Sequence, residues 1–489
     1  MKTDLAIVGA GPGGYVAALR AAQLGMRVVV VESTHLGGTC LNRGCIPTKA
    51  MLETATVAHM MKRAATYGVV LETPPRIDLA VAFARRDAIV KQLRTGVRGL
   101  LAHNNVTVMA GRARFLGANS LAIEPTGCDV GLGKNAKSMF DATIEAANII
   151  IATGSKAAAL PMPGSQLPGV IDSDGALALT SVPKSIAIIG AGAIGCEWSC
   201  ILSRLGCQVT LIEKLPQVLP QVEKELGAVL AEMLISEGIT VHTGATIRGI
   251  LQEGSNLRVQ LEYAAKDGEE GMSTQAALEV EHVLVAAGRL PVVEDLDLRA
   301  AGVETGPGGW IPTDSYQRTN VASVLAIGDV TGGPLLAHVA LREGIVAVEK
   351  LAGLTPRPLS VDRVPFVVYT DPEIACVGLT EEQALGRGYQ VAIGRFSFAN
   401  NGRAVAQGKG RGLVKVVAEA RFGQLLGVHM VGPNVSELVA EAVLAIETEA
   451  SLGEFTSVVR AHPTLSEAIM EAGLAAAGRA LHSVGGWSR

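Results

Sequence analysis

Aromatic residues are scarce in this chain, and it has neither a tract of one charge nor a long uninterrupted apolar run. Phe, Trp and Tyr make up 3% of the 489 residues, and 42 basic and 46 acidic side chains give a formal net charge of −4. This balance, without an aromatic platform, argues against nucleic acid or another polyanion as a partner. Although 48% of the residues are hydrophobic, glycine, charged or polar residues interrupt every stretch before the ~18 residues of a spanning helix. We therefore expect small molecules or proteins as partners, and no membrane.

Cysteine is also sparse. The seven cysteines are an odd number, which fits no secreted disulfide framework in a chain this long. Met1 and Lys2 precede an apolar run that could resemble a signal peptide, but Asp4 interrupts it and no small-residue cleavage site follows. We expect a cytoplasmic protein, in which a deliberate cysteine pair is more often catalytic than structural.

The N-terminal region contains a dinucleotide-binding pattern. A buried strand at Thr3–Val8 is followed by a glycine-rich turn, a helix at Tyr15–Leu24 and a second strand at Val28–Val31. In this pattern one glycine makes the tight turn, one lets the backbone approach a pyrophosphate, one permits close helix packing, and a terminal acid binds ribose hydroxyls. These residues are Gly9, Gly11, Gly14 and Glu32, respectively.

The same pattern occurs a second time. A strand at Ser185–Ile189 leads into a turn with Gly190, Gly192 and Gly195, and Glu213 closes the next strand at the offset of Glu32. Two copies predict two bound dinucleotides. A carboxylate at this position accepts ribose hydroxyls and repels a 2′-phosphate, so Glu213 favours NAD over NADP. The alternative is that Glu213 is a solvated strand end.

Between the two copies lies the stretch from Gly37 to Lys49, which contains Cys40 and Cys45. In an ideal α-helix, Cα atoms five positions apart are separated by more than ~7 Å, which is beyond the reach of a disulfide. A bridge here requires a distorted helix start, which Gly44 and Pro47 make plausible. A strained bridge is easily reduced, so a redox pair is favoured over two ordinary buried thiols.

The remaining elements predict an α/β protein with two Rossmann-like dinucleotide-binding domains and a C-terminal α+β dimerisation domain. A strand at Val283–Ala287 is expected to return toward the first domain. From about Thr355 onward, strands and helices without a further glycine turn suit a domain that contacts another subunit. The expected units are 1–155 (FAD-binding, first part), 156–280 (NAD-binding), 281–354 (completing the FAD site) and 355–489 (dimerisation).

With these motifs in place, the chain resembles the flavoprotein disulfide reductases over essentially its whole length. The resemblance rests on GGTCLNRGCIPTK at 37–49 and HPTLSEA at 462–468. It implies that the first copy binds FAD and the second, with Gly288, binds NAD. Positions that match FAD-contacting motifs are Glu32, Gly38, Thr39, Lys49, Gly111, Thr153, Gly154, Asp329 and Ala337.

The resemblance also implies roles in a homodimer. Cys45 would lie against the flavin, and Cys40 would exchange electrons with a dithiol substrate. His462 of the other subunit would be the acid–base that makes a thiolate of Cys40, oriented by Glu467. Lys49 would pair with Glu197. Thr464 to Glu467 also forms a capping-box pattern, so Glu467 could simply hold a helix start.

Within the family, the chain is most similar to enzymes that oxidise dihydrolipoamide with NAD. Their partner would be a lipoyl domain of a 2-oxoacid dehydrogenase or glycine cleavage complex. An NAD(P)H-dependent reductase of another disulfide, such as glutathione, is the alternative, and the apolar Ala50-Met51-Leu52 favours a lipoyl chain over it. A binding subunit with incidental catalysis is a third possibility. The family's GRxPN pattern departs here at Val292, where a polar residue is usual.

Overall fold

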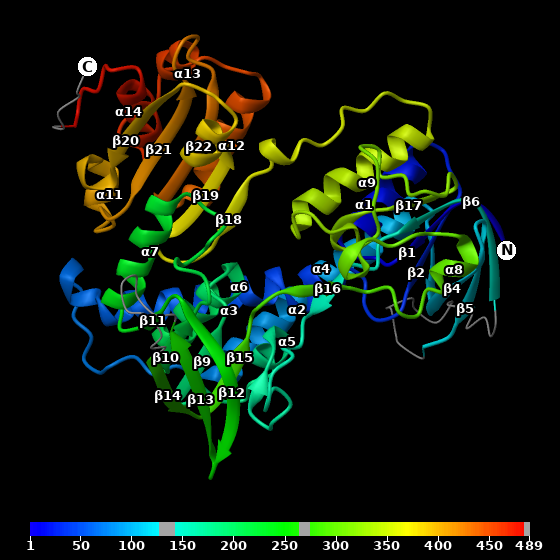
Figure 1. Cartoon of the computed structure of the whole chain (residues 1–489), viewed down its shortest axis with the longest axis horizontal. Coiled ribbons are helices and arrows are strands. Elements are labelled where there is room, and N and C mark those ends of the chain that lie inside the picture. Colours follow the sequence, from blue (N-terminus) through cyan, green and yellow to red (C-terminus); the bar gives the residue numbers. More distant parts are fainter. Residues whose placement is uncertain (127–141, 264–273, 484–489) are drawn as a thin grey trace.

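A computed structural model describes residues 1–126, 142–263 and 274–483, which form three units, each built on its own sheet (Figure 1). In the first unit the strand order is β3-β2-β1-β6-β5-β4, and β17 pairs with the free edge of β6. The strands are β1 (Lys2–Val8), β2 (Val28–Glu32), β3 (Thr107–Ala110), β4 (Arg112–Gly117), β5 (Ser120–Glu124), β6 (Ala142–Ile151) and β17 (Val324–Ala326). The last strand, β17, follows all the strands of the second unit in the chain, so the second unit is inserted within the sequence of the first.

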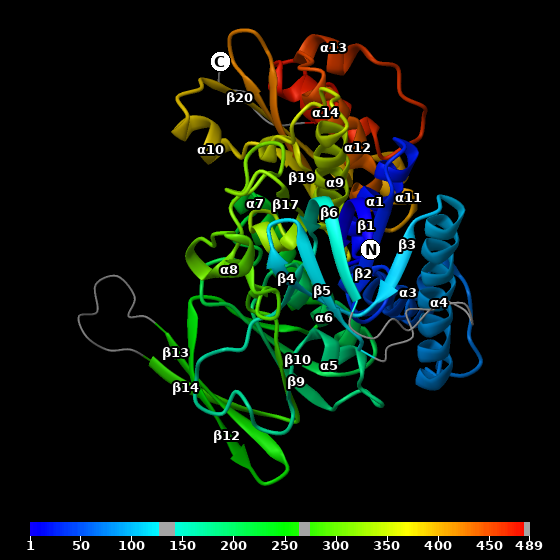
Figure 2. The same cartoon turned by 90° about the vertical axis from the view of Figure 1, so that its right-hand side faces the viewer.

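Both faces of the first sheet are buried, as expected for a parallel core. Along β1, Leu5 and Ile7 pack on one face, and Ala6 and Val8 pack on the other. Figure 1 shows α9 beside α1 over this sheet, and Figure 2 shows α4 alongside β3. The helices are α1 (Pro12–Gln23), α2 (Gly38–Arg43), α3 (Cys45–Lys62), α4 (Leu79–His103), α8 (Leu298–Ala301) and α9 (Ala337–Leu351).

Helix α1 begins at Pro12, earlier than the Tyr15 expected from the sequence. Proline is well tolerated at the first helical position because its missing N–H would have no partner there. The helix therefore starts directly at the glycine turn, and its first amides face the end of the sheet.

The second unit has a parallel sheet in the order β11-β10-β9-β15-β8. Its strands are β8 (Val170–Ile171), β9 (Ser185–Ile189), β10 (Gln208–Ile212), β11 (Thr240–His242) and β15 (His282–Val285), with helices α5 (Ser173–Leu177), α6 (Ala193–Arg204) and α7 (Lys224–Ser236). An antiparallel sheet of β12 (Ala245–Glu253), β13 (Asn256–Tyr263) and β14 (Thr274–Val280) lies between β11 and β15 in the chain.

One expectation is wrong here. The strand near Val283 pairs in parallel with β9 and β8 and so belongs to the second sheet, not to the return toward the first unit. An apolar run of this kind suits either sheet, and only pairing distinguishes them. The return is made by the short antiparallel pair β7 (Ser155–Ala157) and β16 (Arg289–Pro291).

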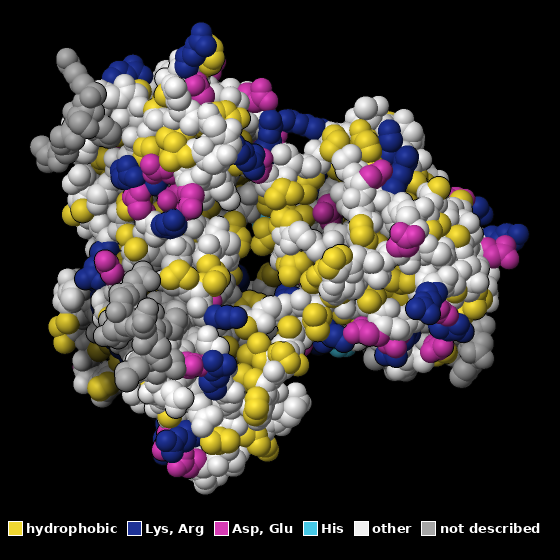
Figure 3. All heavy atoms as spheres, viewed as in Figure 1, with side chains coloured by type: hydrophobic (Ala, Val, Ile, Leu, Met, Phe, Trp, Pro, Cys, Tyr) yellow, Lys and Arg dark blue, Asp and Glu magenta, His cyan; other side chains and the backbone are white. Residues whose placement is uncertain are grey.

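The third unit is an antiparallel sheet in the order β18-β19-β22-β21-β20. Its strands are β18 (Phe366–Val368), β19 (Glu373–Gly378), β20 (Val391–Ser397), β21 (Leu413–Glu419) and β22 (Leu425–Gly432); its helices are α10 (Glu381–Gly386), α11 (Gly402–Ala406), α12 (Val435–Glu447), α13 (Leu452–Ser457) and α14 (Glu467–Ala476). The space-filling view shows basic and acidic side chains interspersed over one face (Figure 3). None of the described helices combines the length and apolar character needed to cross a membrane.

Candidate redox and dinucleotide sites

The two glycine turns have the same stereochemistry. Gly9 has φ +102° and Gly190 has φ +99°, values that L side chains rarely adopt. A Cβ on Gly14 would lie 2.0 Å from the oxygen of Gly9, and one on Gly195 would lie 1.9 Å from the oxygen of Gly190. These glycines therefore have the tight-turn and close-packing roles that the sequence predicts.

The middle glycines face free space instead. A Cβ on Gly192 would meet nothing within 4 Å, and one on Gly11 would meet only the Cα of Gly38, at 3.9 Å. Each is the residue before a helix, and neither α1 nor α6 has a side-chain cap or an acid in its first turn. Free amides at a positive helix end suit a phosphate group. Both turns therefore fit the pyrophosphate of a dinucleotide.

The two strand-end acids are held in matching positions. Glu32 accepts hydrogen bonds from the amides of Ala10 and Thr34, each at 2.8 Å. Glu213 accepts them from the amides of Ala191 at 2.8 Å and Leu215 at 2.9 Å. The carboxylates thus bridge their own strand ends to the glycine turns, where a ribose would lie. Glu213 is more than a solvated strand end.

The other residues implied for FAD gather at the same edge of the first sheet. The Gly111 amide donates to the main-chain oxygen of Glu32 at 2.9 Å, and Gly38, with φ +59°, lies against Gly11. Thr153 Oγ1 donates to the main-chain oxygen of Val292 at 2.6 Å. The Val292 amide in turn donates to the main-chain oxygen of Gly154 at 3.0 Å. Thr39 lies in the first turn of α2, Ala337 begins α9, and Asp329 accepts from Ser155 Oγ at 2.5 Å. The structure brings these positions together around β1 and β6.

Gly288 lies in the link between the two units. It has φ +95°, its oxygen accepts from the amide of Ala158 at 3.1 Å, and a Cβ there would lie 3.7 Å from that of Ala158. It follows β15 closely, so it sits at the carboxyl edge of the second sheet, beside the turn at Gly190. That edge is where ligands bind in open α/β sheets.

Sequence reasoning missed Glu343, which lies on the buried side of α9. Its carboxylate accepts from the amide of Gly328 at 2.6 Å and so fixes the turn before Asp329. Burial raises the pKa of Glu343 to about 7; the Gly328 amide lowers it, and the Asp329 charge raises it further. The sequence did contain a signal for this residue: Glu343 is an acidic residue four positions after Val339, on the apolar face of the helix.

The cysteine pair spans a broken helix. Helix α2 ends at Arg43, α3 begins at Cys45, and Gly44 between them has φ −133° and ψ −112°. The distortion expected at the helix start is therefore confirmed. Both cysteines are free thiols in the structure and are partly exposed. The break brings the two side chains close enough to hydrogen-bond to each other.

The two thiols have opposite acidities. The hydrogen bond with Cys40 lowers the pKa of Cys45 to about 7, against the effect of burial and with help from the Lys49 ammonium. The same hydrogen bond, burial and the Cys45 charge raise the pKa of Cys40. In the reduced pair, Cys45 is therefore favoured as the thiol that ionises first. The Lys49 ammonium also lowers the pKa of Cys40, but the hydrogen bond, burial and the Cys45 charge outweigh its effect.

Lys49 pairs with Glu197 as the sequence predicts. Its Nζ lies 2.8 Å from Oε2 and 2.9 Å from Oε1 of Glu197 on α6. Lys49 is one helical turn beyond Cys45 on α3, which puts both on one face. This charge pair, which acts on Cys45, is thus contributed jointly by the first and second units.

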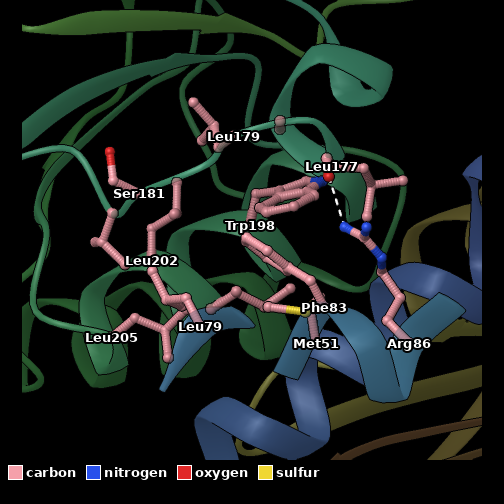
Figure 4. A pocket seen from close by; sticks show the side chains of 13 residues that line it. Met51, Leu79, Phe83, Arg86, Leu177, Leu179, Ser181, Trp198, Leu202 and Leu205 are labelled. Atoms are coloured by element: carbon pink, nitrogen blue, oxygen red, sulfur yellow. Dashed lines mark hydrogen bonds between the residues drawn. The ribbon is translucent and has the colours of Figure 1, made fainter. Parts of the chain in front are cut away.

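The apolar face expected at Ala50-Met51-Leu52 is not available to a substrate. Ala50 and Met51 are buried, and Leu52 packs against the same core. Figure 4 shows Met51 beside Trp198 of α6 and Phe83 of α4 in an interior apolar pocket. This stretch packs α3 between the two units, so it does not distinguish a lipoyl chain from glutathione.

The second half of the expected acid–base site is formed within the third unit. His462 Nδ1 lies 2.9 Å from Oε1 of Glu467, and the Thr464 amide donates to Oε2 at 2.8 Å. Glu467 therefore orients the imidazole and fixes the loop that leads into α14. The capping box expected from Thr464 to Glu467 is not formed, because Ser466 is the N-cap of α14 and makes no side-chain cap hydrogen bond. The His462 side chain is 80% exposed. No hydrogen bond or ion pair joins it to either redox cysteine among the described residues.

The other cysteines lie in the core. Cys196 and Cys200 share a face of α6, and Cys207 and Cys376 are also buried; burial raises the pKa of all four thiols. Cys128 lies outside the described residues. Within the described ranges, no group of three or more His, Cys, Asp or Glu is arranged to hold a metal ion.

Comparison with known proteins agrees with this geometry. A dihydrolipoyl dehydrogenase from Thermus scotoductus is 44% identical over 452 residues, covering 91% of this chain and 92% of the relative. One from Halobacterium salinarum is 43% identical over 445 residues, covering 91% and 90%.

Among solved structures, LpdA from Mycobacterium tuberculosis has a TM-score of 0.85 and 25% identity, covering 96% of this chain and 99% of that one. The Cu(II) complex of the HOCl-induced flavoprotein disulfide reductase RclA from Escherichia coli has a TM-score of 0.83 and 26% identity, covering 97% and 99%. The family model for pyridine nucleotide-disulphide oxidoreductases matches residues 3–344, and the model of that family's dimerisation domain matches 364–473. The chain therefore belongs to the pyridine nucleotide-disulphide oxidoreductases.

Proposed function

We propose that this protein is a dihydrolipoyl dehydrogenase that oxidises dihydrolipoamide with NAD through Cys40, Cys45 and bound FAD. The observation that carries the proposal is the thiol pair across Gly44, in which the pKa of Cys45 is lowered to about 7. The names of relatives at 43–44% identity over nine-tenths of the chain support the choice of substrate.

The chain's own chemistry is thiol–disulfide exchange. One substrate thiolate attacks Cys40 in the Cys40–Cys45 disulfide, the S–S bond breaks, and its electron pair goes to Cys45. The second substrate thiolate then displaces Cys40, which closes the lipoamide disulfide and leaves a Cys45 thiolate and a Cys40 sulfur that takes up a proton. The Lys49 charge, which lowers the pKa of Cys45, favours Cys45 as the leaving group. Bound FAD and NAD supply the onward transfer of the two electrons.

Two protons leave the substrate dithiol during this exchange: His462 is suited to accept one and pass it to Cys40, and the other is released to solvent. Its Nδ1 is held by Glu467, which leaves Nε2 to face the substrate. Because His462 is exposed and is not linked to the cysteines of its own chain, we place it at the disulfide of a second copy. The proposed assembly is a homodimer in which each active site takes Cys40 and Cys45 from one subunit and His462 and Glu467 from the other.

The match of residues 364–473 to the dimerisation-domain model of this family supports that assembly. Further elements of the proposal are Glu32 for FAD, Glu213 for NAD, a lipoyl-bearing protein as partner, and a reducing, cytoplasmic location that keeps the thiols reduced.

A steady-state comparison on purified, FAD-loaded protein tests the proposal. NADH formation from dihydrolipoamide and NAD is set against NADPH or NADH consumption with oxidised glutathione. Fast turnover only in the first assay is the expected result. Turnover only in the second, especially with NADPH, would keep the disulfide chemistry and overturn both the substrate and the role of Glu213.

A further inference from the structure

The Lys49–Glu197 pair has a third member, Tyr369, which belongs to the dimerisation domain. Lys49 Nζ lies 4.5 Å from the centre of the Tyr369 ring. The main-chain amide of Tyr369 donates to Oε1 of Glu197 at 3.0 Å. One residue thus contacts both charges: its ring lies under the cation, and its amide binds the anion. Tyr369 follows β18 directly and is half-buried.

The segment that carries Tyr369 is fixed to α6 at two points. Glu197 and Arg204 lie two turns apart on α6 and therefore on the same side of it. Arg204 Nη2 binds Asp371 Oδ2 at 2.9 Å, and the Arg204 side chain is only 2% exposed. With the Tyr369 amide held by Glu197 as well, the main chain on either side of residue 370 is anchored. The ring position over Lys49 therefore does not depend on the tyrosine hydroxyl.

The position of the Lys49 ammonium matters because it stands between two anionic groups. Lys49 lowers the pKa of Cys45 and Glu197 raises it, although the hydrogen bond from Cys40 has the larger effect. If the ammonium moves, its attraction for the Cys45 thiolate changes directly. An aromatic face attracts a cation above it, and the attraction grows as water is excluded. The Tyr369 ring adds a restraint on Nζ that Glu197 alone does not supply.

We propose that Tyr369 is a positioning residue of the redox centre, whose ring and amide hold the Lys49–Glu197 pair so that the Lys49 charge stays near Cys45. The dimerisation domain thereby acts on the thiol pair of its own chain, in addition to presenting His462 to a partner. The inference rests on the proposed function only in taking Cys45 as a redox thiol.

The test is a pH titration of the Cys45 thiolate in the reduced, FAD-loaded protein. The ultraviolet absorbance of the thiolate is recorded at a series of pH values, which requires no reagent to reach Cys45; neither dihydrolipoamide nor NAD is present. For Tyr369→Leu we expect the apparent pKa of Cys45 to rise by about half a unit, so that the thiolate fraction below that pKa falls about threefold. The amide contact to Glu197 is kept in this variant, so the shift reports on the ring.

Two control variants accompany Tyr369→Leu. Tyr369→Phe keeps the ring and should titrate as the unmodified protein does. Tyr316→Leu removes another tyrosine whose ring lies 4.6 Å from a lysine, Lys350 on α9, and should not move the Cys45 titration. If Tyr369→Leu loses FAD, Tyr369→Met, which is similar in length and has no ring, takes its place with the same expected shift.

An unchanged or lowered Cys45 pKa in Tyr369→Leu, or an equal shift in Tyr369→Phe, would overturn the inference. Because the titration needs no substrate, its outcome is separate from the choice of substrate. A protein that is inactive on dihydrolipoamide but shows the expected shift would contradict the proposed function and leave the role of Tyr369 standing.

Discussion

Glu467 holds His462 through a single short contact, 2.9 Å from Oε1 to Nδ1, while its second oxygen accepts from the Thr464 amide. One carboxylate thus orients the proposed base and fixes the loop that leads into α14. Of the two roles expected for Glu467, the structure supports the contact with His462 and not the capping box, because the N-cap of α14 is Ser466 and has no side-chain cap.

We expect His462→Gln to lower kcat for dihydrolipoamide by about 10²- to 10⁴-fold, the usual contribution of a general base. Glu467→Gln should lower kcat less, because the imidazole remains and only its orientation is weakened. Glu454→Gln is the matched control, since Glu454 caps α13 through Ser451 in the same domain without contacting a histidine. Equal losses of kcat in Glu467→Gln and Glu454→Gln would show that Glu467 has only a structural role.

Because Glu32 and Glu213 have equivalent positions, replacing either one should weaken the binding of a dinucleotide, but of a different dinucleotide in each case. Each carboxylate accepts two main-chain amides at its own glycine turn. Because hydrogen bonds to a charged group contribute ~1.5–3 kcal/mol, Glu213→Gln should raise the KM for NAD by about tenfold or more while FAD content stays constant. Glu32→Gln should instead lower FAD retention on gel filtration. A loss of FAD in Glu213→Gln would show that the two glycine turns are assigned to the wrong dinucleotides.

The buried acid Glu343 predicts a pH dependence of stability. Its pKa is raised by burial from 4.5 to about 7, so the folded state holds a proton that the unfolded state has released between these values. Stability is therefore present in full below pH ~4.5 and is lost as pH rises through ~7, by at most about 3 kcal/mol.

Glu343→Gln removes this titration and keeps an oxygen for the Gly328 amide. The melting temperature of the unmodified FAD-loaded protein should fall relative to that of the variant as pH rises from 5 to 7.5. Above pH 7.5 the difference between the two should stay constant. Curves that are parallel throughout would show that Glu343 is already ionised at pH 5 in the folded protein.

The sequence predicted those parts of the site that depend on local geometry. Gly9, Gly14, Gly190 and Gly195 are required by contacts within their own turns, so their spacing sufficed to identify them. The break at Gly44 followed from the reach of a disulfide. Even the Lys49–Glu197 pair was named, although only through the family resemblance.

The expectations that were wrong and the residue contacts that were missed depend on packing between segments that are distant in the sequence. Met51 looked like a substrate surface because nothing in its neighbourhood reveals that Trp198 and Phe83 cover it. The strand near Val283 suits either sheet until its pairing with β9 is known. Tyr369 reaches the redox centre from a different domain, through a ring contact that leaves no pattern in the sequence.

Each active site is proposed to be built from two chains, and hybrid dimers of two inactive variants test this assembly most directly. Cys45→Ser and His462→Gln chains with different affinity tags are co-expressed, and dimers carrying both tags are isolated and assayed with dihydrolipoamide and NAD. If Cys45 of one chain works with His462 of the other, one site in each hybrid is intact, and the hybrid has about half the activity of the unmodified dimer while both parent homodimers are inactive. A hybrid as inactive as its parents would place Cys45 and His462 in the same chain's site and contradict the account.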